Sequence, residues 1–162
     1  MSNVKHTNLF LWRIDSFSEI LRQPKYEGKE RIDSDPFCTK TETESYDYKL
    51  KVILYPNGDS PWSNNPLSVY IVVMKGKYDA ILPWPFKKKV KFILFDQQEN
   101  LDQRENVATV FVTQNLLNFV RPVTEENAGK GWRTFVSEKL YSRRFIVDDT
   151  FFLQVEISSS SS

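Results

Sequence analysis

The sequence predicts an all-β fold, an antiparallel β-sandwich of seven to eight strands with only one or two short helices. Short runs of alternating apolar and polar residues recur along the 162 residues, and turn signals separate them. Two of these runs, Leu67–Met74 and Lys89–Asp96, flank the segment Leu82–Phe86, which contains two prolines. Because proline lacks a backbone donor, we expect this segment to connect two strands and to place its aromatic rings at one end of the core.

The N-terminal third predicts two strands and one helix. Asn8–Ile14 alternates apolar and polar residues and is expected to be the first strand. Ser16–Glu19 has the spacing of a capping box, which predicts a short helix through about Arg22. Ile32–Lys40 is expected to hold a short strand that is interrupted by Asp35-Pro36.

The remaining runs complete the sandwich. Tyr46–Tyr55 is the longest clean strand, and Val107–Val112 is a weaker one. Gln114–Phe119 predicts a single helical turn, and Gly129–Gly131 predicts a loop ahead of a further short run. Thr150–Ile157 alternates again and is expected to be the last strand. An edge strand that such a sandwich leaves open is a place where a peptide can add as a further strand.

Length and composition favour one domain. A chain of 162 residues with 14% aromatic residues can bury a core without disulfides or metals. We expect the domain to span residues 8–157, between a disordered N-terminal tail at residues 1–7 and a serine-rich tail at residues 158–162. The N-terminus is polar, so no cleavable leader is expected, and no apolar run approaches the roughly 20 residues that cross a membrane.

Charge and cysteine content exclude several functions. Lys and Arg total 22 and Asp and Glu total 21, so nothing favours nucleic acid as a partner. Cys38 is the sole cysteine, which rules out an internal disulfide and a multi-cysteine zinc site and indicates a reducing, cytoplasmic location. The sequence therefore predicts no metal and no cofactor.

Catalysis has few candidate residues. The only histidine, His6, lies in the polar N-terminal segment, so a nucleophilic pair with Cys38 is not expected. Asp148 and Asp149 are neighbouring carboxylates, but turn or cap duty explains them better than acid–base chemistry. The sequence predicts a chain that is not an enzyme.

One dense basic run stands out. It consists of Lys87, Lys88, Lys89 and Lys91. A solvated turn explains the run best. The alternative is a contact for an acidic peptide or for an anionic lipid headgroup.

Several motifs together carry a family resemblance. They are Phe10–Ile14 with Phe17-Ser18, Tyr55–Asp59, Leu67–Tyr70, Tyr78–Phe86, Phe95–Gln97, Arg121-Pro122 and Val147–Phe152. In this order and spacing they resemble the MATH domain, in particular the C-terminal domain of the tumour-necrosis-factor-receptor-associated factors. The resemblance spans about Asn8 to Ile157, which is nearly the whole chain.

The resemblance implies a fold, a function and a site. The fold is an antiparallel eight-stranded β-sandwich, and the function is to bind short extended peptides from receptor tails or adaptor proteins along a sheet edge. It also implies a set of peptide-binding positions. These are Tyr55, Asp59, Leu117, Asn118, Phe119, Lys130, Gly131 and Trp132.

The sequence departs from the family pattern at two places. Ile53 stands where many members carry an arginine for an acidic ligand side chain, and Leu116–Asn118 replaces a run of serines. Trp132 matches an aromatic residue of the subgroup that prefers Pro-x-Glu-x-x-aromatic/acidic ligands. Lys130 or Arg133 is the expected substitute for the missing arginine.

Family membership leaves two further questions open. MATH domains also serve as substrate-recognition domains of ubiquitin-pathway proteins, either ligase adaptors or deubiquitinases, and this is the alternative function. Full-length receptor-associated factors form homotrimers through a coiled coil and carry a zinc-binding RING. The sequence shows neither heptads before Phe10 nor the cysteines of a RING, so trimer formation is an expectation about a parent protein.

Overall fold

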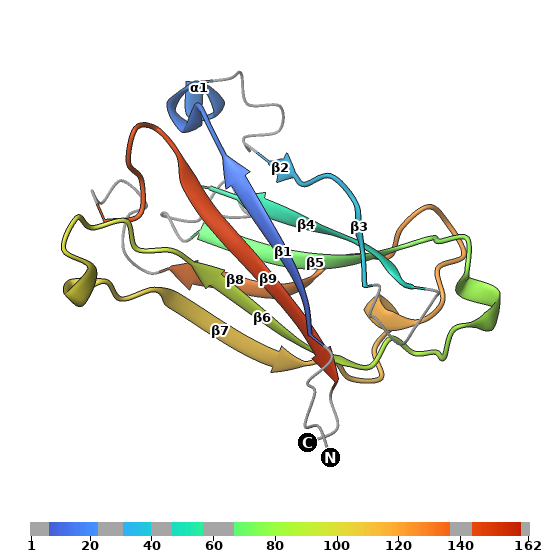
Figure 1. Cartoon of the computed structure of the whole chain (residues 1–162). Helices are drawn as coiled ribbons and strands as arrows, with labels where there is room; N and C mark the ends of the chain where they lie inside the picture. The colour runs from blue at the N-terminus through green and yellow to red at the C-terminus, as the bar shows by residue number, and fades with distance from the viewer. Residues whose placement is uncertain (1–6, 23–30, 40–46, 57–66, 137–143, 160–162) are drawn as a thin grey trace, which may run out of the picture.

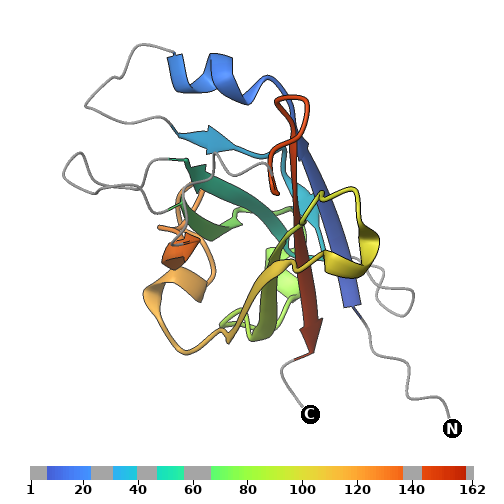
Figure 2. The same cartoon turned by 90° about the vertical axis from the view of Figure 1, so that its left-hand side faces the viewer.

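The computed structural model describes residues 7–22, 31–39, 47–56, 67–136 and 144–159, and every structural statement below concerns these residues. They form two antiparallel sheets with the orders β1-β9-β6-β7 and β2-β4-β5-β8, and β3 also pairs with β4. The first sheet lies in front of the second in Figure 1. Seen from the side in Figure 2, β1 and β9 lie on one side of the molecule and β2 and β4 on the other.

The elements follow one another in this order: β1 Thr7–Ile14, α1 Phe17–Arg22, β2 Ile32–Asp33, β3 Phe37–Cys38, β4 Lys49–Tyr55, β5 Leu67–Met74, the 3₁₀ helix η1 Asp79–Ile81, β6 Lys88–Leu94, η2 Leu101–Gln103, β7 Val107–Val112, η3 Leu117–Phe119, β8 Lys130–Val136 and β9 Phe151–Ser159.

The all-β antiparallel sandwich is confirmed, with nine strands in the described residues instead of eight. The difference lies at Asp35-Pro36, where the interrupted strand divides into β2 and β3, which both pair with β4. Pro36 has no backbone donor, so it cannot continue the ladder between them. β9 also runs through Ser158 and Ser159, because Ser158 pairs with Thr7 on one side and with Lys89 on the other.

Alternation along the strands builds the core between the sheets. Leu50, Val52 and Leu54 of β4 point inward and are fully buried. The inner faces of β5, β6 and β9 supply the same kind of residue. They are Val69, Ile71, Val73, Val90, Phe92, Leu94, Leu153, Val155 and Ile157.

The proline-containing connection closes one end of the core, as predicted. Phe86 is fully buried and meets the ring of Tyr48 edge-on at 4.8 Å. Trp84 also packs on Tyr48, and its indole Nε1 donates to the carbonyl of Asp79 at 2.8 Å. The backbone N–H of Phe86 donates to the carbonyl of Phe119, so the same connection holds η3 in place.

Helix α1 begins where the capping-box spacing predicts, but its side-chain cap comes from elsewhere in the chain. The Glu19 N–H donates to the backbone carbonyl of Ser16 at 3.1 Å. The N–H and the hydroxyl of Ser18 both donate to the carboxylate of Asp149, at 2.8 and 2.7 Å. The cap role expected of the Asp148-Asp149 pair is therefore confirmed for Asp149.

Two edge strands, β7 and β8, lie on the same open side of the sandwich. Each is the last strand of its sheet. The sequence predicts a loop at Gly129–Gly131, but β8 already begins at Lys130, because Lys130 and Gly131 pair with Ile71 and Tyr70 of β5. Strand periodicity alone could not show this, since a glycine inside a strand reads as a turn signal.

Candidate functional site

A groove of about 490 Å³ lies between β7 and β8. Its walls come from the end of β7, the start of β8 and the segment around η3. Its lining residues are Phe111, Val112, Gln114, Leu116, Phe119, Lys130, Gly131 and Trp132. Four residues that the family resemblance implies, Phe119, Lys130, Gly131 and Trp132, thus come together here.

Local geometry explains why these side chains meet. Lys130 and Trp132 pair with Ile71 and Val69, whose side chains face the core. At the sheet edge the same orientation carries Lys130 and Trp132 toward the open side, instead of into the core. Phe119 is only 1% exposed and forms the floor of the groove, whereas Trp132 is 38% exposed at its rim.

The groove is mainly apolar, with a few polar groups. Five of its eight lining residues are aliphatic or aromatic, and Gln114 and Lys130 supply the polar side chains. Because β8 is an edge strand, alternate backbone N–H and C=O groups point away from β5. The arrangement suits an extended chain that places one apolar side chain in the groove and an acidic or hydrogen-bonding group beside it.

Gly131 lets β8 lie close against β5 beside the groove. A Cβ added at Gly131 would come 2.9 Å from the Cα of Tyr70 and nearer still to the carbonyl oxygen of Val69. The ring of Tyr70 meets the ring of Tyr55 edge-on at 5.9 Å. Tyr55 thus lies beyond Gly131, on the outer face of the second sheet, and does not line the groove.

The other implied positions have different surroundings. Leu117 is 84% exposed and is not among the lining residues. Asn118 donates from its side chain to the carbonyls of Ala128 and Gly129, at 3.0 and 3.2 Å, so it fixes η3 against the segment before β8. Asp59 lies outside the described residues.

The outer face of the second sheet carries an ion-pair cluster beside Ile53, at the place of the family arginine. Lys51 pairs with Asp33 at 2.8 Å and with Glu126 at 2.7 Å, and Arg31 pairs with Asp33 at 2.6 Å. The hydrogen bond from Arg31 is the main cause that holds the pKa of Asp33 below its usual value. Two basic and two acidic groups offset one another in this cluster. Of the two expected substitutes for the arginine, Lys130 lines the groove and Arg133 does not.

The basic run is divided by the strand that carries it. Lys89 and Lys91 point to the outer face of the first sheet, because they alternate with the buried Val90 and Phe92. Lys88 lies on the same side of β6 as Val90, and Lys87 precedes the strand. Alternation therefore separates Lys88 from the outer-facing lysines.

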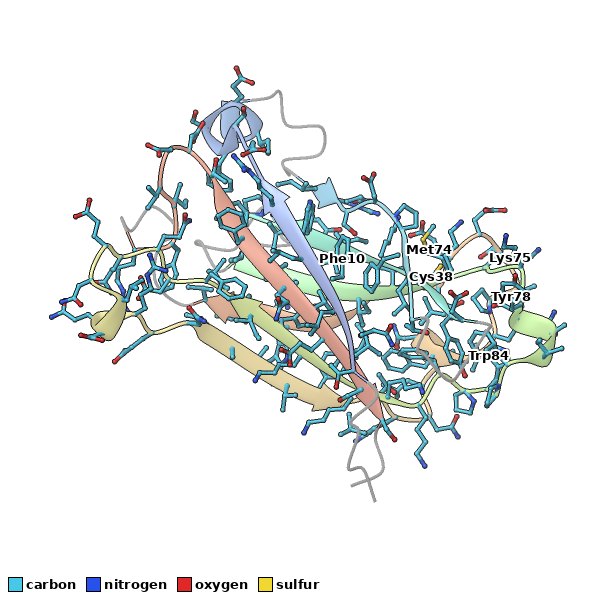
Figure 3. The ribbon with its side chains drawn as sticks, viewed as in Figure 1. Phe10, Cys38, Met74, Lys75, Tyr78 and Trp84 are labelled. Atoms are coloured by element: carbon cyan, nitrogen blue, oxygen red, sulfur yellow. The ribbon has the colours of Figure 1, made fainter. Side chains whose placement is uncertain are left out.

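A second pocket, of about 390 Å³, lies at the end of the sandwich near η1. Its lining includes Cys38, Asp47, Lys75 and Tyr78, and Figure 3 shows Cys38, Lys75 and Tyr78 at this end of the molecule. Partial burial raises the pKa of the Cys38 thiol, and the charge of Asp47 raises it further. The group is therefore a protonated thiol at neutral pH and a weak nucleophile.

Two further features concern metals and membranes. Within the described residues, no three His, Cys, Asp or Glu side chains gather closely enough to hold a metal ion. In the same part of the chain, every helix is too short or too polar to cross a membrane. His6 lies outside the described residues.

Several groove residues are not among the predicted site positions. They are Phe111, Val112, Gln114 and Leu116. The alternation of Val107–Val112 assigns Val112 to one face of a strand, but it does not show that this strand lies at a sheet edge opposite β8. The sequence likewise predicts Tyr70 only as a strand residue, because alternation does not show that Tyr70 pairs with Gly131.

A model of the MATH domain family matches residues 9–157. The chain belongs to the MATH domain family. This MATH domain is 34% identical to TNF receptor-associated factor 1 of Mus musculus, over 99% of the chain and 38% of that protein. It is 35% identical to human TNF receptor-associated factor 2, over 92% of the chain and 29% of that protein. The chain therefore spans well under half the length of these relatives.

A solved structure gives the same result. TRAF5 from Notothenia coriiceps superposes with a TM-score of 0.76 at 26% identity, covering 95% of this chain and 74% of that one. The predicted sandwich and the predicted resemblance to the C-terminal domain of the receptor-associated factors are both confirmed.

Proposed function

We propose that this MATH domain is a non-enzymatic adaptor domain that binds short extended peptides from receptor tails or signalling adaptors, in signalling of the TNF-receptor type. The similarity to receptor-associated factors supports the adaptor role. The observation that carries the proposal is the apolar groove beside the open edge of β8. The domain is proposed to comprise residues 8–157 and to act in the cytoplasm.

In the proposed mechanism, main-chain pairing supplies affinity and side-chain contacts supply selectivity. A ligand strand pairs its main chain with the edge of β8, and one of its apolar side chains enters the groove over Phe119 and against Trp132. Lys130 pairs with an acidic ligand side chain, in place of the arginine that Ile53 replaces. Tyr55 contacts the far end of the ligand, beyond Gly131.

Single peptides are expected to bind weakly. One groove of this size buries far less surface than the roughly 1,600 Å² of a standard protein–protein interface. Clustered receptors and a trimeric parent protein compensate for this weak binding, because linked copies raise the effective concentration of the domain near its peptides. We therefore assign homotrimer formation to the parent protein, through a coiled coil.

Amide chemical-shift mapping tests the location of the site. Addition of an unlabelled peptide with a Glu-x-x-aromatic core to ¹⁵N-labelled protein is expected to shift the amides of Lys130 and Gly131 and the indole N–H of Trp132. The amides of Ala80 and Glu99, which lie in distant exposed segments, serve as internal controls. Shifts confined to the outer face of either sheet would refute the groove.

A further inference from the structure

The outer face of the first sheet carries an ordered pattern of side chains that the groove does not explain. Cross-strand pairing places Leu9, Glu156, Lys91 and Val110 in one row across β1, β9, β6 and β7. Leu9 is 62% exposed and Val110 is 44% exposed. The row thus reads apolar, acidic, basic, apolar.

The next row on this face carries no charge. It contains Leu11, Gln154, Ile93 and Ala108, and Leu11 is 55% exposed. No described helix or strand crosses this face, which forms the front of the molecule in Figure 1. Exposed apolar side chains therefore lie at both margins of this sheet face, and exposed apolar groups that gather on one face mark interaction surfaces.

The pattern is complementary to itself. A two-fold axis parallel to the strands, between β9 and β6, lays the face of one chain on that of a second chain and reverses the order of the strands. Glu156 then faces Lys91 of the second copy, and Lys91 faces its Glu156. Leu9 faces Val110, and Leu11 faces Ala108. In the first row each charge meets its opposite and the apolar margins meet each other. Lys89, one row further along, faces the uncharged Ser158.

We propose that the outer face of β1-β9-β6-β7 is a self-association surface, on which a second copy of this chain packs face to face. The sheets of a sandwich cross at about 30° because each is twisted, so the central row stays opposed while the outer rows slide. Strand spacings of about 4.8 Å and rises of about 3.4 Å per residue give a face of roughly 500 Å² per chain. This is below the roughly 800 Å² per partner of a stable complex, so the dimer is weak and forms at high local concentration.

Sedimentation velocity between about 10 µM and 1 mM tests the proposal, because weak complexes exchange in this range. The wild type is expected to show a sedimentation coefficient that rises with concentration toward that of a dimer. Lys91→Glu leaves two acidic groups in the central row, and Glu156→Lys leaves two basic ones, so each variant alone is expected to stay monomeric. Lys77→Glu and Glu99→Lys make the same charge changes away from this face and should dimerise as the wild type does.

Mixing supplies the decisive outcome. An equimolar mixture of Lys91→Glu and Glu156→Lys is expected to dimerise, because each acidic pair then meets a basic pair. The double variant Lys91→Glu/Glu156→Lys restores the pairing within each chain, so it is expected to associate with itself and not with the wild type. A wild type that stays monomeric to about 1 mM, a dimer that persists in both single variants, or a mixture that stays monomeric would each overturn the proposal.

Discussion

Gly131 of β8 lies directly opposite Tyr70 of β5, with no room for a side chain between the two backbones. A methyl group at Gly131 would force β8 away from β5, because its nearest neighbours are backbone atoms and cannot rotate aside. We therefore expect Gly131→Ala to lower the free energy of unfolding by about 2–4 kcal/mol, the range of severe backbone and packing defects. Urea denaturation measures this difference. Ala80→Gly, at an exposed position in η1, is the control, and an unchanged stability of Gly131→Ala would contradict the close approach.

The ion pair of the buried Asp96 with the partly exposed Arg144 predicts how stability depends on pH. Asp96 is 2% exposed, and the guanidinium of Arg144 donates to its Oδ2 at 2.9 Å. Burial raises the pKa of Asp96, but hydrogen bonds from the backbone of Glu105 and Gln98, from the Gln98 side chain and from Arg144 outweigh burial and hold the pKa well below its usual value. The charged carboxylate is therefore the form that the fold stabilises.

We expect Asp96→Asn to cost about 3 kcal/mol of unfolding free energy at pH 7, since the neutral amide weakens the hydrogen bonds that the buried carboxylate accepts from Arg144 and from the backbone of Gln98 and Glu105. A carboxyl whose pKa is lowered on folding stabilises the fold above its unfolded pKa of about 3.9, and this contribution is lost as pH falls further toward the folded pKa. The difference between wild type and Asp96→Asn should therefore shrink below about pH 4. Denaturation at pH 7, 4 and 3 measures it. Asp102→Asn, at an exposed position, is the control, and a difference that stays constant with pH would contradict the account.

The cap that Asp149 provides for α1 predicts a difference between two substitutions. Asp149 has a φ of 59° and accepts from both the N–H and the hydroxyl of Ser18. Asparagine tolerates this backbone conformation and keeps an acceptor oxygen, whereas alanine does neither. Asp149→Ala is expected to lower the free energy of unfolding by about 1–2 kcal/mol, and Asp149→Asn is expected to lower it much less. Thermal denaturation measures both changes. Equal losses would show that the side-chain cap does not matter.

Substitutions of two neighbouring groove residues should have different effects on stability and on peptide binding. Phe119 is almost fully buried and packs on Phe86, so Phe119→Ala is expected to destabilise the domain by about 3–4 kcal/mol through the cavity that it leaves. Leu116 is 38% exposed at the groove wall. Leu116→Ala should therefore change the unfolding free energy by less than about 1 kcal/mol while weakening peptide binding. Chemical denaturation and peptide titration of both variants check the contrast. The prediction is wrong if Leu116→Ala lowers the free energy of unfolding by as much as Phe119→Ala does.

Most of the fold could be predicted from local patterns, because alternation reports which side of a strand is buried. The strands Asn8–Ile14, Leu67–Met74 and Thr150–Ile157 were expected within one or two residues of their observed bounds. The start of β8 was not, because Gly131 resembles a turn residue until its pairing with Tyr70 is known. The capping-box spacing predicts the start of α1, but no local pattern shows that Asp149, 131 residues from Ser18 along the chain, caps this particular helix.

The site was only partly accessible from the sequence. Family resemblance pointed to Phe119, Lys130, Gly131 and Trp132, and the structure brings these four together in one groove. The remaining walls depend on which strands become sheet edges, which is a property of the topology and not of a local pattern. The ion pairs of Lys51 with Asp33 and Glu126 join residues from three separate segments, and no local pattern indicates them.

A peptide titration tests the central claim most directly. Fluorescently labelled extended peptides, with Gln-Glu-type and Glu-x-x-aromatic cores, are titrated by anisotropy into the wild type, Trp132→Ala and Tyr55→Ala. Val147→Ala, at an apolar site outside the groove that is likewise 38% exposed, is the matched control. We predict micromolar-to-millimolar binding, a loss of roughly tenfold in Trp132→Ala from about 1.4 kcal/mol of lost contact, and no change in the control. If no peptide binds, or if Trp132→Ala binds as the wild type does, the groove between β7 and β8 is not a peptide site.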